Sequence, residues 1–424
     1  MQIEFSTKKS GESRFHSFPS PGPFPKELAD VPGFVNELTG YTLATSPCPN
    51  RVLAFAGALA CLAHLAGRSC TDLHGTRTNL YLVVLGESGI GKDAPRKTNV
   101  RLLERVGFEA SAEESFASGE AMEDKLYAMP CKLLQSDEVA AFFGRMRGRG
   151  AAARSLSERM RRLFTSSSSP AFVVRGKAND ASVRTIAFPH LTVFGTGIPD
   201  EFLDTLTPGE IRDGLFGRCL ILQAEDEYDV QSPTVGIPMP ERVVRTAELL
   251  AKREMDAIAS GVFARRTVGE TPEAAEFLSG VRKESLDLRR RLSAADLPLA
   301  RATVVRMDEK IAKLAMLYAL SEDAESPVIT KPAVEWALAF TTYVTKWMLF
   351  EGQFHTAEGS FGKLTEHAKA VISKHGGSIG RRDFFRALHC DEMTFKRVVK
   401  ALLIAEEIEE PELVDGKIRY TLLK

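Results

Sequence analysis

The stretch "NLYLVVLGESGIGKDAP", residues 79–95, decides how the whole chain is interpreted. Its apolar run ends at Gly86, where a glycine-rich turn begins and leads into an amphipathic helical pattern. Gly86, Gly91 and Lys92 match G-x-x-x-x-G-K, in which backbone N–H groups of a tight turn surround phosphate oxygens and the lysine adds positive charge. We therefore predict a strand, a phosphate-binding loop and a helix. The candidate nucleotide-binding residues of this loop are Gly86, Glu87, Ser88, Gly89, Ile90, Gly91, Lys92 and Asp93.

Asp93 stands where loops of this pattern carry a Ser or Thr that ligates Mg²⁺. A carboxylate can also ligate Mg²⁺, but it adds negative charge close to the phosphates. One interpretation is that Asp93 binds the metal and that the site hydrolyses ATP. The alternative is a site that binds nucleotide weakly or turns it over slowly. We expect the active site, with ATP and Mg²⁺ as its ligands.

The composition excludes several classes of protein. The chain has 424 residues, 44% of them hydrophobic, and a net charge of -1, so any nucleic-acid binding must come from local basic patches. Six cysteines without a CxxC pair argue against a zinc site and against disulfides. The N-terminus lacks a signal-peptide pattern, and the apolar run 52–67 is short for a membrane span and contains His64. We expect a cytoplasmic protein with no membrane partner.

Four apolar runs, at 80–86, 131–137, 190–196 and 218–225, alternate with helical patterns. This alternation predicts an α/β fold with a parallel sheet that is covered on both faces. The expected organisation has five parts: a flexible arm (1–25), an N-terminal helical segment (26–78), a P-loop ATPase core (79–235), a helical domain (236–354) and a C-terminal DNA-binding module (363–424).

Polar residues follow the later predicted strands. Asp137 and Glu138 come after the second strand, at the edge of a parallel sheet where ligands bind. Asp137 would hold Mg²⁺ and Glu138 would polarise the attacking water, although acidic residues also favour a helix N-terminus. Thr196 ends the third strand and could sense the γ-phosphate or simply form a turn. Arg218 precedes the last strand and could reach the γ-phosphate of a neighbouring subunit, or form a structural salt bridge.

The order of these blocks over roughly residues 50–350, from "NLYLVVLGESGIGKD" through "LLQSDEVAAFF", "FPHLTVFGTGIPDEF" and "GLFGRCLIL" to "RMDEKIAKLAMLYAL", resembles a family. It is the phage- and plasmid-associated family of helicase- or primase-helicase-like P-loop ATPases of the YfjI type. The resemblance implies a RecA- or AAA-like core that works as a ring, usually a hexamer, on DNA in mobile-element replication. It places the family's functional lysine on Lys92, its acidic pair on Asp137 and Glu138, and its arginine on Arg218. Asp93 departs from the family's Ser or Thr.

An arginine-rich segment, 144–164, follows the acidic strand end. A loop at this position can face the central channel of a ring, where arginines would follow a single-stranded phosphate backbone. The alternative is a solvated helix face. The candidate DNA contacts in this segment are Arg145, Arg147, Arg149 and Arg154.

The last sixty residues predict three helices and a hairpin, an arrangement that resembles a winged helix-turn-helix domain. Asp391 would cap the third helix, and Asp415-Gly416 would form the hairpin turn. The third helix of such a domain enters the major groove, and the start of the second contacts phosphates. A winged helix that binds protein is the alternative. The candidate contacts to double-stranded DNA are Arg381, Arg382, Thr394, Lys396, Arg397 and Lys400.

Together these features predict an ATP-dependent DNA helicase, translocase or replication initiator of a mobile element, which hydrolyses ATP between the subunits of a ring. The first alternative is a nucleotide-gated, non-hydrolysing protein that binds an origin or regulates DNA. The second is an ATPase that acts on protein.

Overall fold

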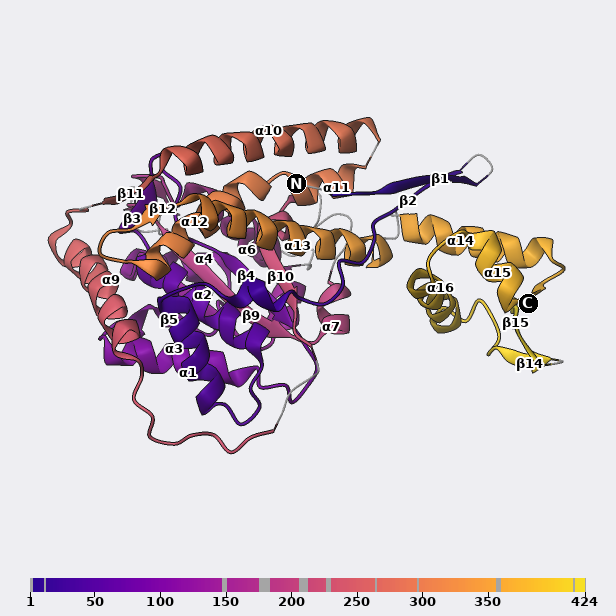
Figure 1. Ribbon diagram of the computed structural model, residues 1–424, viewed down its shortest axis with the longest axis horizontal. Helices are drawn as coiled ribbons and strands as arrows, with labels where there is room; N and C mark the ends of the chain where they lie inside the picture. Colours follow the sequence, from indigo (N-terminus) through magenta and orange to yellow (C-terminus); the bar gives the residue numbers. More distant parts are fainter. Residues whose placement is uncertain are drawn as a thin grey trace. The chain divides into compact units, whose positions relative to one another are not determined.

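The computed structural model describes residues 3–10, 13–146, 151–174, 184–205, 213–225, 230–263, 265–295, 297–355, 360–414 and 416–423. The chain divides into two compact units (Figure 1). The larger consists mainly of Pro21–Thr205 and Glu210–Met348, and the smaller mainly of Glu4–Ser20 and Leu349–Lys424.

The large unit is built on a parallel sheet of five strands within the described residues. The strands are β4 (Tyr81–Leu85), β5 (Ala112–Glu113), β6 (Cys131–Ser136), β9 (His190–Gly197) and β10 (Cys219–Gln223). Their order is β10-β4-β9-β6-β5, and every pair is parallel. The predicted α/β class, the parallel sheet and the four predicted strands are confirmed, whereas β5, with two residues, was not predicted.

Helices cover both faces of this sheet. Strand β9 shows the two sides: Gly195 lies against Val139 of one layer, and Phe194 lies toward Gly57 of the other. Neighbouring residues of a strand point to opposite faces, so the two layers lie on opposite sides. The first layer contains α4 (Gly119–Ala128), α5 (Val139–Met146), α6 (Ala151–Ser166) and α7 (Pro199–Leu203), and the second contains α1 (Phe34–Thr45), α2 (Arg51–Ala66), α3 (Asp93–Arg105) and α9 (Glu241–Ser260).

Helix α2 is apolar on all sides because it is enclosed on all sides. Every residue from Val52 to Ala66 is buried. One hydrophobic core joins α1 and α2, the sheet, α9, α12 (Met307–Glu322) and α13 (Lys331–His355). The segments expected as 26–78, 79–235 and 236–354 therefore share one core.

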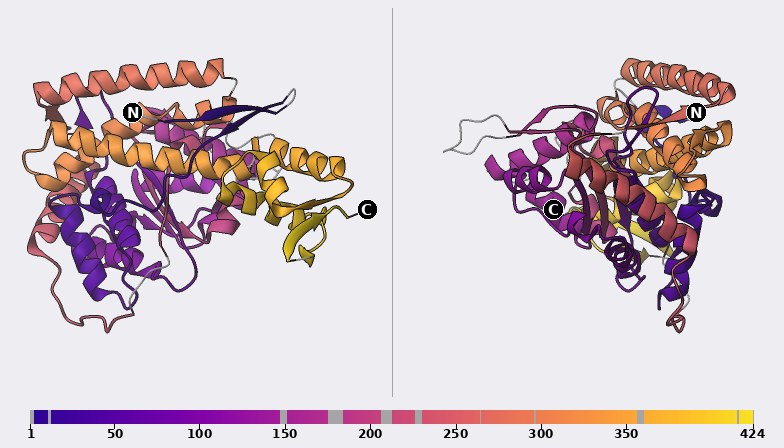
Figure 2. Two further views of the ribbon diagram at one scale, coloured as in Figure 1. Left: turned by 45° about the vertical axis from the view of Figure 1, so that its right-hand side comes forward. Right: turned by 90° about the vertical axis from the view of Figure 1, so that its left-hand side faces the viewer.

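The remaining elements of the large unit lie around this core. A small parallel sheet, β12-β11-β3, joins distant parts of the chain, and α10 runs along the outside of the unit in both views of Figure 2. The bounds are η1 (Lys26–Ala29), β3 (Cys70–Asp72), η2 (Glu109–Ser111), β7 (Phe172–Val173), β8 (Thr185–Ile186), η3 (Phe216–Arg218), β11 (Arg266–Glu270), α10 (Pro272–Ala294), α11 (Pro298–Val304) and β12 (Val328–Ile329).

The small unit contains the three expected C-terminal helices and the expected hairpin, packed around their own core. The helix sequence expected from Ser378 begins at Arg381 instead, because Ser378–Gly380 pairs with the last strand as β13. Asp391 caps the third helix, as predicted, through the N–H of Thr394. Asp415 lies outside the described residues. The elements are α14 (Ser360–Lys374), β13, α15 (Arg381–Leu388), α16 (Glu392–Ile404), β14 (Glu412–Val414) and β15 (Lys417–Thr421).

Part of the expected flexible arm is folded. Strands β1 (Ser6–Ser10) and β2 (Ser13–Ser17) pair antiparallel, and the rings of Phe5 and Phe18 lie 6.0 Å apart. Their polar composition pointed to a flexible segment, but backbone pairing in a hairpin does not need an apolar face of its own.

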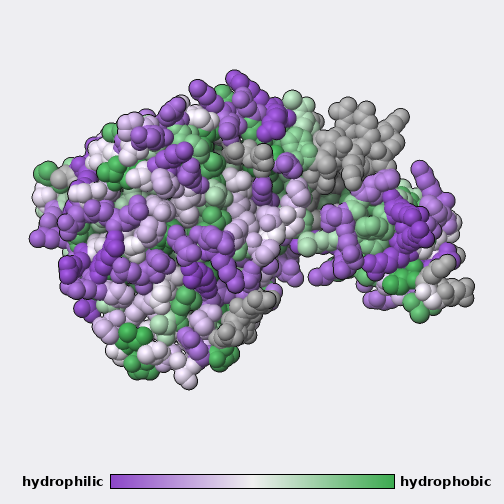
Figure 3. Space-filling model, viewed as in Figure 1, coloured by the Kyte–Doolittle hydropathy of each residue, from purple (hydrophilic) through white to green (hydrophobic). Residues whose placement is uncertain are grey.

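In the part of the chain that the structure describes, no helix is long and apolar enough to cross a membrane. Hydrophilic residues cover much of the face seen in Figure 3, and hydrophobic residues show there in separate small groups.

Two lysines of α12 are buried in the core, and they generate a prediction about pH. Lys310 donates to the carbonyl of Cys219 (2.7 Å) and Lys313 to Asn79 Oδ1 (2.5 Å). Burial lowers the pKa of each lysine to about 8. Above pH 8 these lysines of the folded protein therefore release protons that the unfolded chain keeps, so their contribution to stability should rise from pH 8 toward 9. Each lysine should add about 1 kcal/mol over that unit.

Urea unfolding at pH 7.5, 8.5 and 9 would measure this rise, and Lys310→Met should make it smaller. A wild-type and a variant profile with the same slope would contradict the assignment of buried, partly neutral lysines. Burial raises the pKa of the Cys61, Cys70, Cys131 and Cys219 thiols, which act in the opposite direction over the same range, so the difference between the wild-type and Lys310→Met profiles isolates the lysine contribution.

Candidate functional site

The glycine loop lies where the order of the sheet reverses. Strand β4 leads through α3 to β5 at one end of the sheet, and the chain then returns strand by strand to β10 at the other end. Loops from β4 and from its neighbour β9 therefore leave toward opposite faces, which opens a crevice at their carboxyl ends. Gly86 donates its N–H to Gly197 O (2.9 Å) at this edge, so the loop begins in the crevice.

Two close approaches hold the loop and the start of α3. Gly91 has a φ of 87°, and a Cβ at this position would overlap the carbonyl oxygen of Cys48. Gly57 of α2 lies against Pro95 in the first turn of α3, where a Cβ would overlap the proline ring. A side chain at either position would move the loop or the helix.

Lys92 lies directly before α3 and donates from Nζ to the carbonyl of Gly86 (3.1 Å). Its ammonium group is thus held over the glycine loop by a backbone oxygen. The first N–H groups of α3 are also directed to this end of the helix, and together with the lysine they favour an anion. Glu87, Ser88 and Gly89 are exposed, whereas Ile90 is buried and fixes the loop to the core.

Arg96 brings the two predicted metal ligands together. Its Nη2 lies 3.3 Å from Asp93 Oδ1 and 3.3 Å from Asp137 Oδ2, and its Nη1 lies 3.4 Å from Glu114 Oε1. A hydrogen bond from Lys97 to Asp93 (3.1 Å) keeps the pKa of Asp93 below its usual value, so this carboxyl is ionised at neutral pH. Asp93 and Asp137 therefore face one shared cation, which is the guanidinium of Arg96.

The carboxylates of Asp93 and Asp137 fit Mg²⁺ only as part of a larger set of ligands. Mg²⁺ is usually bound by one or two carboxylates, water and the phosphates of a substrate. Asp93 and Asp137 supply two carboxylates, and Arg96 shows that they can share one cation. The described residues contain no group of three His, Cys, Asp or Glu side chains that could hold a metal ion by themselves. A metal at this place would therefore need phosphate oxygens as further ligands.

Glu138 and Thr196 complete the crevice. The carboxylate of Glu138 is exposed at the start of α5 and makes no ion pair with another described residue. Thr196 is 2% exposed, and its hydroxyl finds no hydrogen-bond partner among the residues that are described. Strand pairing joins Val84 with Thr196 and Ser136 with Gly195, so the ends of β4, β9 and β6 lie side by side. A buried, unpartnered hydroxyl is costly, which favours a ligand or water at this point.

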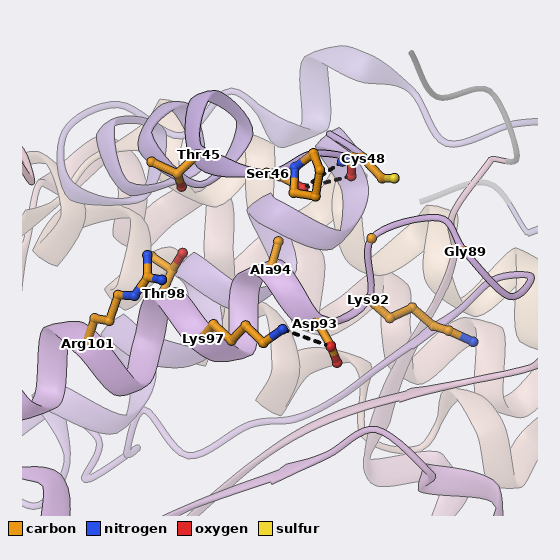
Figure 4. Close-up of a pocket in the computed structure, with 12 residues that line it drawn as sticks. Thr45, Ser46, Cys48, Gly89, Lys92, Asp93, Ala94, Lys97, Thr98 and Arg101 are labelled. Carbon is orange, nitrogen blue, oxygen red and sulfur yellow. Dashed lines mark hydrogen bonds and ion pairs between the residues drawn. The ribbon is translucent and has the colours of Figure 1, made fainter. Parts of the chain in front are cut away.

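A cavity of about 510 Å³ adjoins the loop on the side of α3 (Figure 4). Its volume suits a small organic ligand. Figure 4 shows Lys97 directed at Asp93 and Lys92 directed away from them along the loop. The lining residues are Thr45, Ser46, Pro47, Cys48, Gly89, Gly91, Lys92, Asp93, Ala94, Lys97, Thr98 and Arg101.

Arg218 lies at the other edge of the sheet. It precedes β10, whose first residue, Cys219, pairs with Tyr81 at the start of β4. Arg218 donates to Gly214 O (2.7 Å), and burial lowers its pKa. The length of β4 separates it from the glycine loop, so within one chain it does not join Lys92, Asp137 or Glu138.

Two of the described arginines of the basic segment lie close to carboxylates. Arg159 pairs with Glu123 (2.9 Å), and Arg161 lies 3.9 Å from an Asp213 carboxylate oxygen. Arg145 and Arg154 are exposed, and Arg145 lies over the ring of Phe142. The candidates Arg147 and Arg149 lie outside the described residues. The exposed basic surface of this segment is thus smaller than its composition suggests.

The candidate residues of α16 differ in accessibility. Thr394 is 6% exposed and donates to its cap, Asp391, so it faces inward. Arg397 makes two bonds to the buried carboxylate of Glu351 (2.7 and 3.1 Å), which anchors α16 within the small unit. Lys396 and Lys400 are exposed. Arg382 is exposed as well, and Arg381 pairs with Glu392 (3.2 Å).

Sequence reasoning missed Arg96, Lys97, Arg101 and the cavity wall at Thr45–Cys48. Arg96 and Lys97 could have been found, because residues three and four positions after Asp93 lie on its face of the helix. The wall could not, because its contact with Gly91 joins two segments that are separate in sequence.

A scan of the sequence against protein-family models gives no match, and a search among curated proteins gives none either.

The shared cation of Asp93 and Asp137 gives a prediction. In Arg96→Gln the two carboxylates keep their places but lose the guanidinium that neutralises both, so a divalent cation should bind more tightly. We expect Mn²⁺ affinity, measured by electron paramagnetic resonance, to rise about tenfold.

Arg105→Gln, at the last turn of the same helix, is the matched control and should bind Mn²⁺ like the wild type. Equal or weaker Mn²⁺ binding in Arg96→Gln would show that Arg96 supports the site rather than occupying it.

Proposed function

We propose that this protein binds ATP at the glycine loop, hydrolyses it, and uses the energy to act on DNA. The observation that carries the proposal is the position of the loop: it follows the interior strand β4, at the reversal of a parallel sheet, beside the ends of β6 and β9. Three groups at this crevice are available to a ligand: Lys92, the first N–H groups of α3 and the unpartnered hydroxyl of Thr196. The adjoining cavity has room for a nucleoside.

In this proposal the chain's own groups position the phosphates and the water. The loop N–H groups and Lys92 hold the phosphates, and Asp137 with Asp93 holds the metal, which neutralises charge on the γ-phosphate when it is bound. Glu138 orients water from the start of α5. Arg218 of a second copy would supply positive charge, because Arg218 of the same chain lies at the far edge of the sheet.

The DNA part of the proposal rests on the small unit and on the resemblance to helicase-like P-loop ATPases. Three helices and an antiparallel sheet support a winged-helix assignment, with Lys396 and Lys400 exposed on α16. Action as a hexameric ring in the replication of a mobile element belongs to the same proposal.

One observation favours the second candidate, a nucleotide-gated DNA-binding protein that does not hydrolyse ATP. Arg96 occupies the position between Asp93 and Asp137 that a metal would take, and Asp93 adds negative charge near the phosphates. If the guanidinium stays in place, nucleotide could bind without the metal that hydrolysis needs.

Hydrolysis separates these candidates. Wild-type protein with Mg²⁺ should release phosphate from ATP, faster with single-stranded DNA present. Lys92→Ala should abolish turnover because it removes the phosphate-binding charge, and Glu138→Gln should lower it about 10²- to 10⁴-fold because water loses its base. A phosphate-release assay measures both.

Two controls make the result interpretable. Glu104→Gln, an exposed acid on α3 away from the crevice, should keep wild-type turnover. A wild-type protein that binds ATP without releasing phosphate would rule out the proposed ATP hydrolysis and leave the nucleotide-gated candidate.

The exposed lysines of α16 give a second test, with double-stranded DNA. Lys396→Ala and Lys400→Ala should each reduce the salt dependence of binding, lowering the slope of log K against log salt by about one. Fluorescence anisotropy at several salt concentrations measures the slope.

Arg397→Ala should behave differently from the lysine variants. It leaves the Glu351 carboxylate buried without its cation, so it should destabilise the small unit by about 2 kcal/mol or more. If Arg397→Ala lowered the DNA affinity with no loss of stability, Arg397 would be a DNA contact after all.

A further inference from the structure

Five arginines lie near Cys70 or over the rings of Phe188 and Phe263, at the edge of the large unit that lies away from the glycine loop. They form what we call the arginine cluster: Arg68, Arg77, Arg253, Arg265 and Arg266. Arg68 follows α2, and the sixteen residues of that helix span about 24 Å from the cavity wall at its start. Arg253 is on α9, and Arg266 of β11 pairs with Cys70 of β3. The cluster is therefore separate from the candidate nucleotide site.

Two aromatic rings hold the cluster together. Arg77 and Arg265 both lie over the ring of Phe188, at 4.9 and 4.1 Å from its centroid. Arg68 lies 4.1 Å over the ring of Phe263, which itself contacts Phe188 at 5.7 Å. Cation–π contacts stabilise guanidinium groups but leave their N–H groups unused at the ring edges.

The positive charge of the cluster exceeds its negative charge. Within the described residues its one ion pair joins Arg68 to Glu254 (2.6 Å), and both of these side chains are 1% exposed. Arg77 donates from Nη1 to two backbone carbonyls, Arg68 O and Cys70 O, near the end of α2. Burial, and next the charge of Arg265, lower the pKa of Arg77 to about 10. The arginines thus repel one another without enough carboxylates to compensate.

Several donors of these buried guanidinium groups also lack partners. Arg68 Nη2, Arg77 Nε and Arg253 Nη1 are buried and make no hydrogen bond to any described residue, and the same holds for the acceptor Glu254 Oε2. Arg68 and Arg77 are each 2% exposed. An unpaired buried donor costs free energy, and a charged one costs more. Arg68 Nη2 lies on the guanidinium edge that pairs with Glu254, and two bonds of Arg77 go to carbonyls near the end of α2, so Arg77 Nε and Arg253 Nη1 are the donors left unexplained.

We propose that the arginine cluster binds a phosphate group, as a second phosphate site that is independent of the glycine loop. Guanidinium donors match phosphate oxygens in geometry, and one phosphate would satisfy several of the free donors and the excess charge together. Arg265 is exposed and Phe263 partly so, which gives the phosphate a way in and would allow a base to stack beside it. The phosphate would be free or carried by a nucleic-acid strand.

The test uses a Lys92→Ala background, in which the glycine loop has lost its phosphate-binding charge. The thermal midpoint is measured in increasing sodium phosphate against sodium chloride of the same ionic strength. Phosphate should raise the midpoint beyond the effect of chloride, since a ligand of the native state stabilises it. Adding Arg265→Ala or Arg253→Gln should weaken the apparent phosphate affinity about tenfold.

Arg245→Ala is the matched control, because Arg245 is an exposed arginine of α9 that pairs with Glu241 outside the cluster. It should leave the phosphate effect unchanged. Stabilisation by phosphate in the wild type alone, and not in Lys92→Ala, would assign the effect to the glycine loop and overturn the proposal. So would a midpoint that rises equally in phosphate and chloride, or equally with and without Arg265.

A labelled single-stranded oligonucleotide distinguishes the source of the phosphate. If anisotropy shows about tenfold weaker binding on adding Arg265→Ala, and inorganic phosphate competes, the cluster takes the phosphate of a nucleic-acid strand. If only the inorganic phosphate effect is lost, the ligand is a small anion. Neither result depends on ATP hydrolysis, so failure of the proposed ATPase would leave this test unaffected.

Discussion

The burial of α2 between the sheet and the outer helices is the packing interaction on which the rest of the large unit depends. Its sixteen residues contact α1, α3, α9 and α12 as well as three strands, and nearly all are inaccessible to water. A helix with so much apolar surface is stable only when it is enclosed. The position of α2 then fixes the segments that precede and follow it in the chain.

At its first turn, α2 fixes the candidate nucleotide site. Asn50 caps the helix through the N–H of Leu53 and donates to Glu225 O beyond β10, which secures the preceding loop against the sheet. In that loop the carbonyl oxygen of Cys48 lies against Gly91, and Gly57 of α2 leaves room for Pro95 at the start of α3. Arg68 follows the last turn of the same helix, and its backbone carbonyl accepts a hydrogen bond from the side chain of Arg77. One rigid element thus sets the glycine loop and the arginine cluster about 24 Å apart.

The sequence predicted those parts of the fold whose cause is local. Apolar runs identify four buried strands, the G-x-x-x-x-G-K spacing identifies the loop, and Asp391 identifies the start of α16. Strand β5 was not predicted, because two residues are too few to show a hydrophobic periodicity. Two pairs were not predicted because they join segments far apart in the chain: Arg96 with Asp137 at the candidate nucleotide site, and Arg68 with Glu254 in the arginine cluster. The structure gives a reason why the glycine loop tolerates Asp93: Arg96, one helical turn later, compensates its negative charge.

The direction of the strands limits how the candidate residues can cooperate. In a parallel sheet every strand ends at one edge and begins at the other, so loops that follow strands never meet residues that precede them. Lys92, Asp137 and Thr196 all follow strands, whereas Arg218 precedes β10. The five residues of β4 alone separate the two edges by about 16 Å. Any role for Arg218 at a bound phosphate therefore requires a second copy that turns its strand-starting edge toward the first, and assembly becomes part of the proposed chemistry.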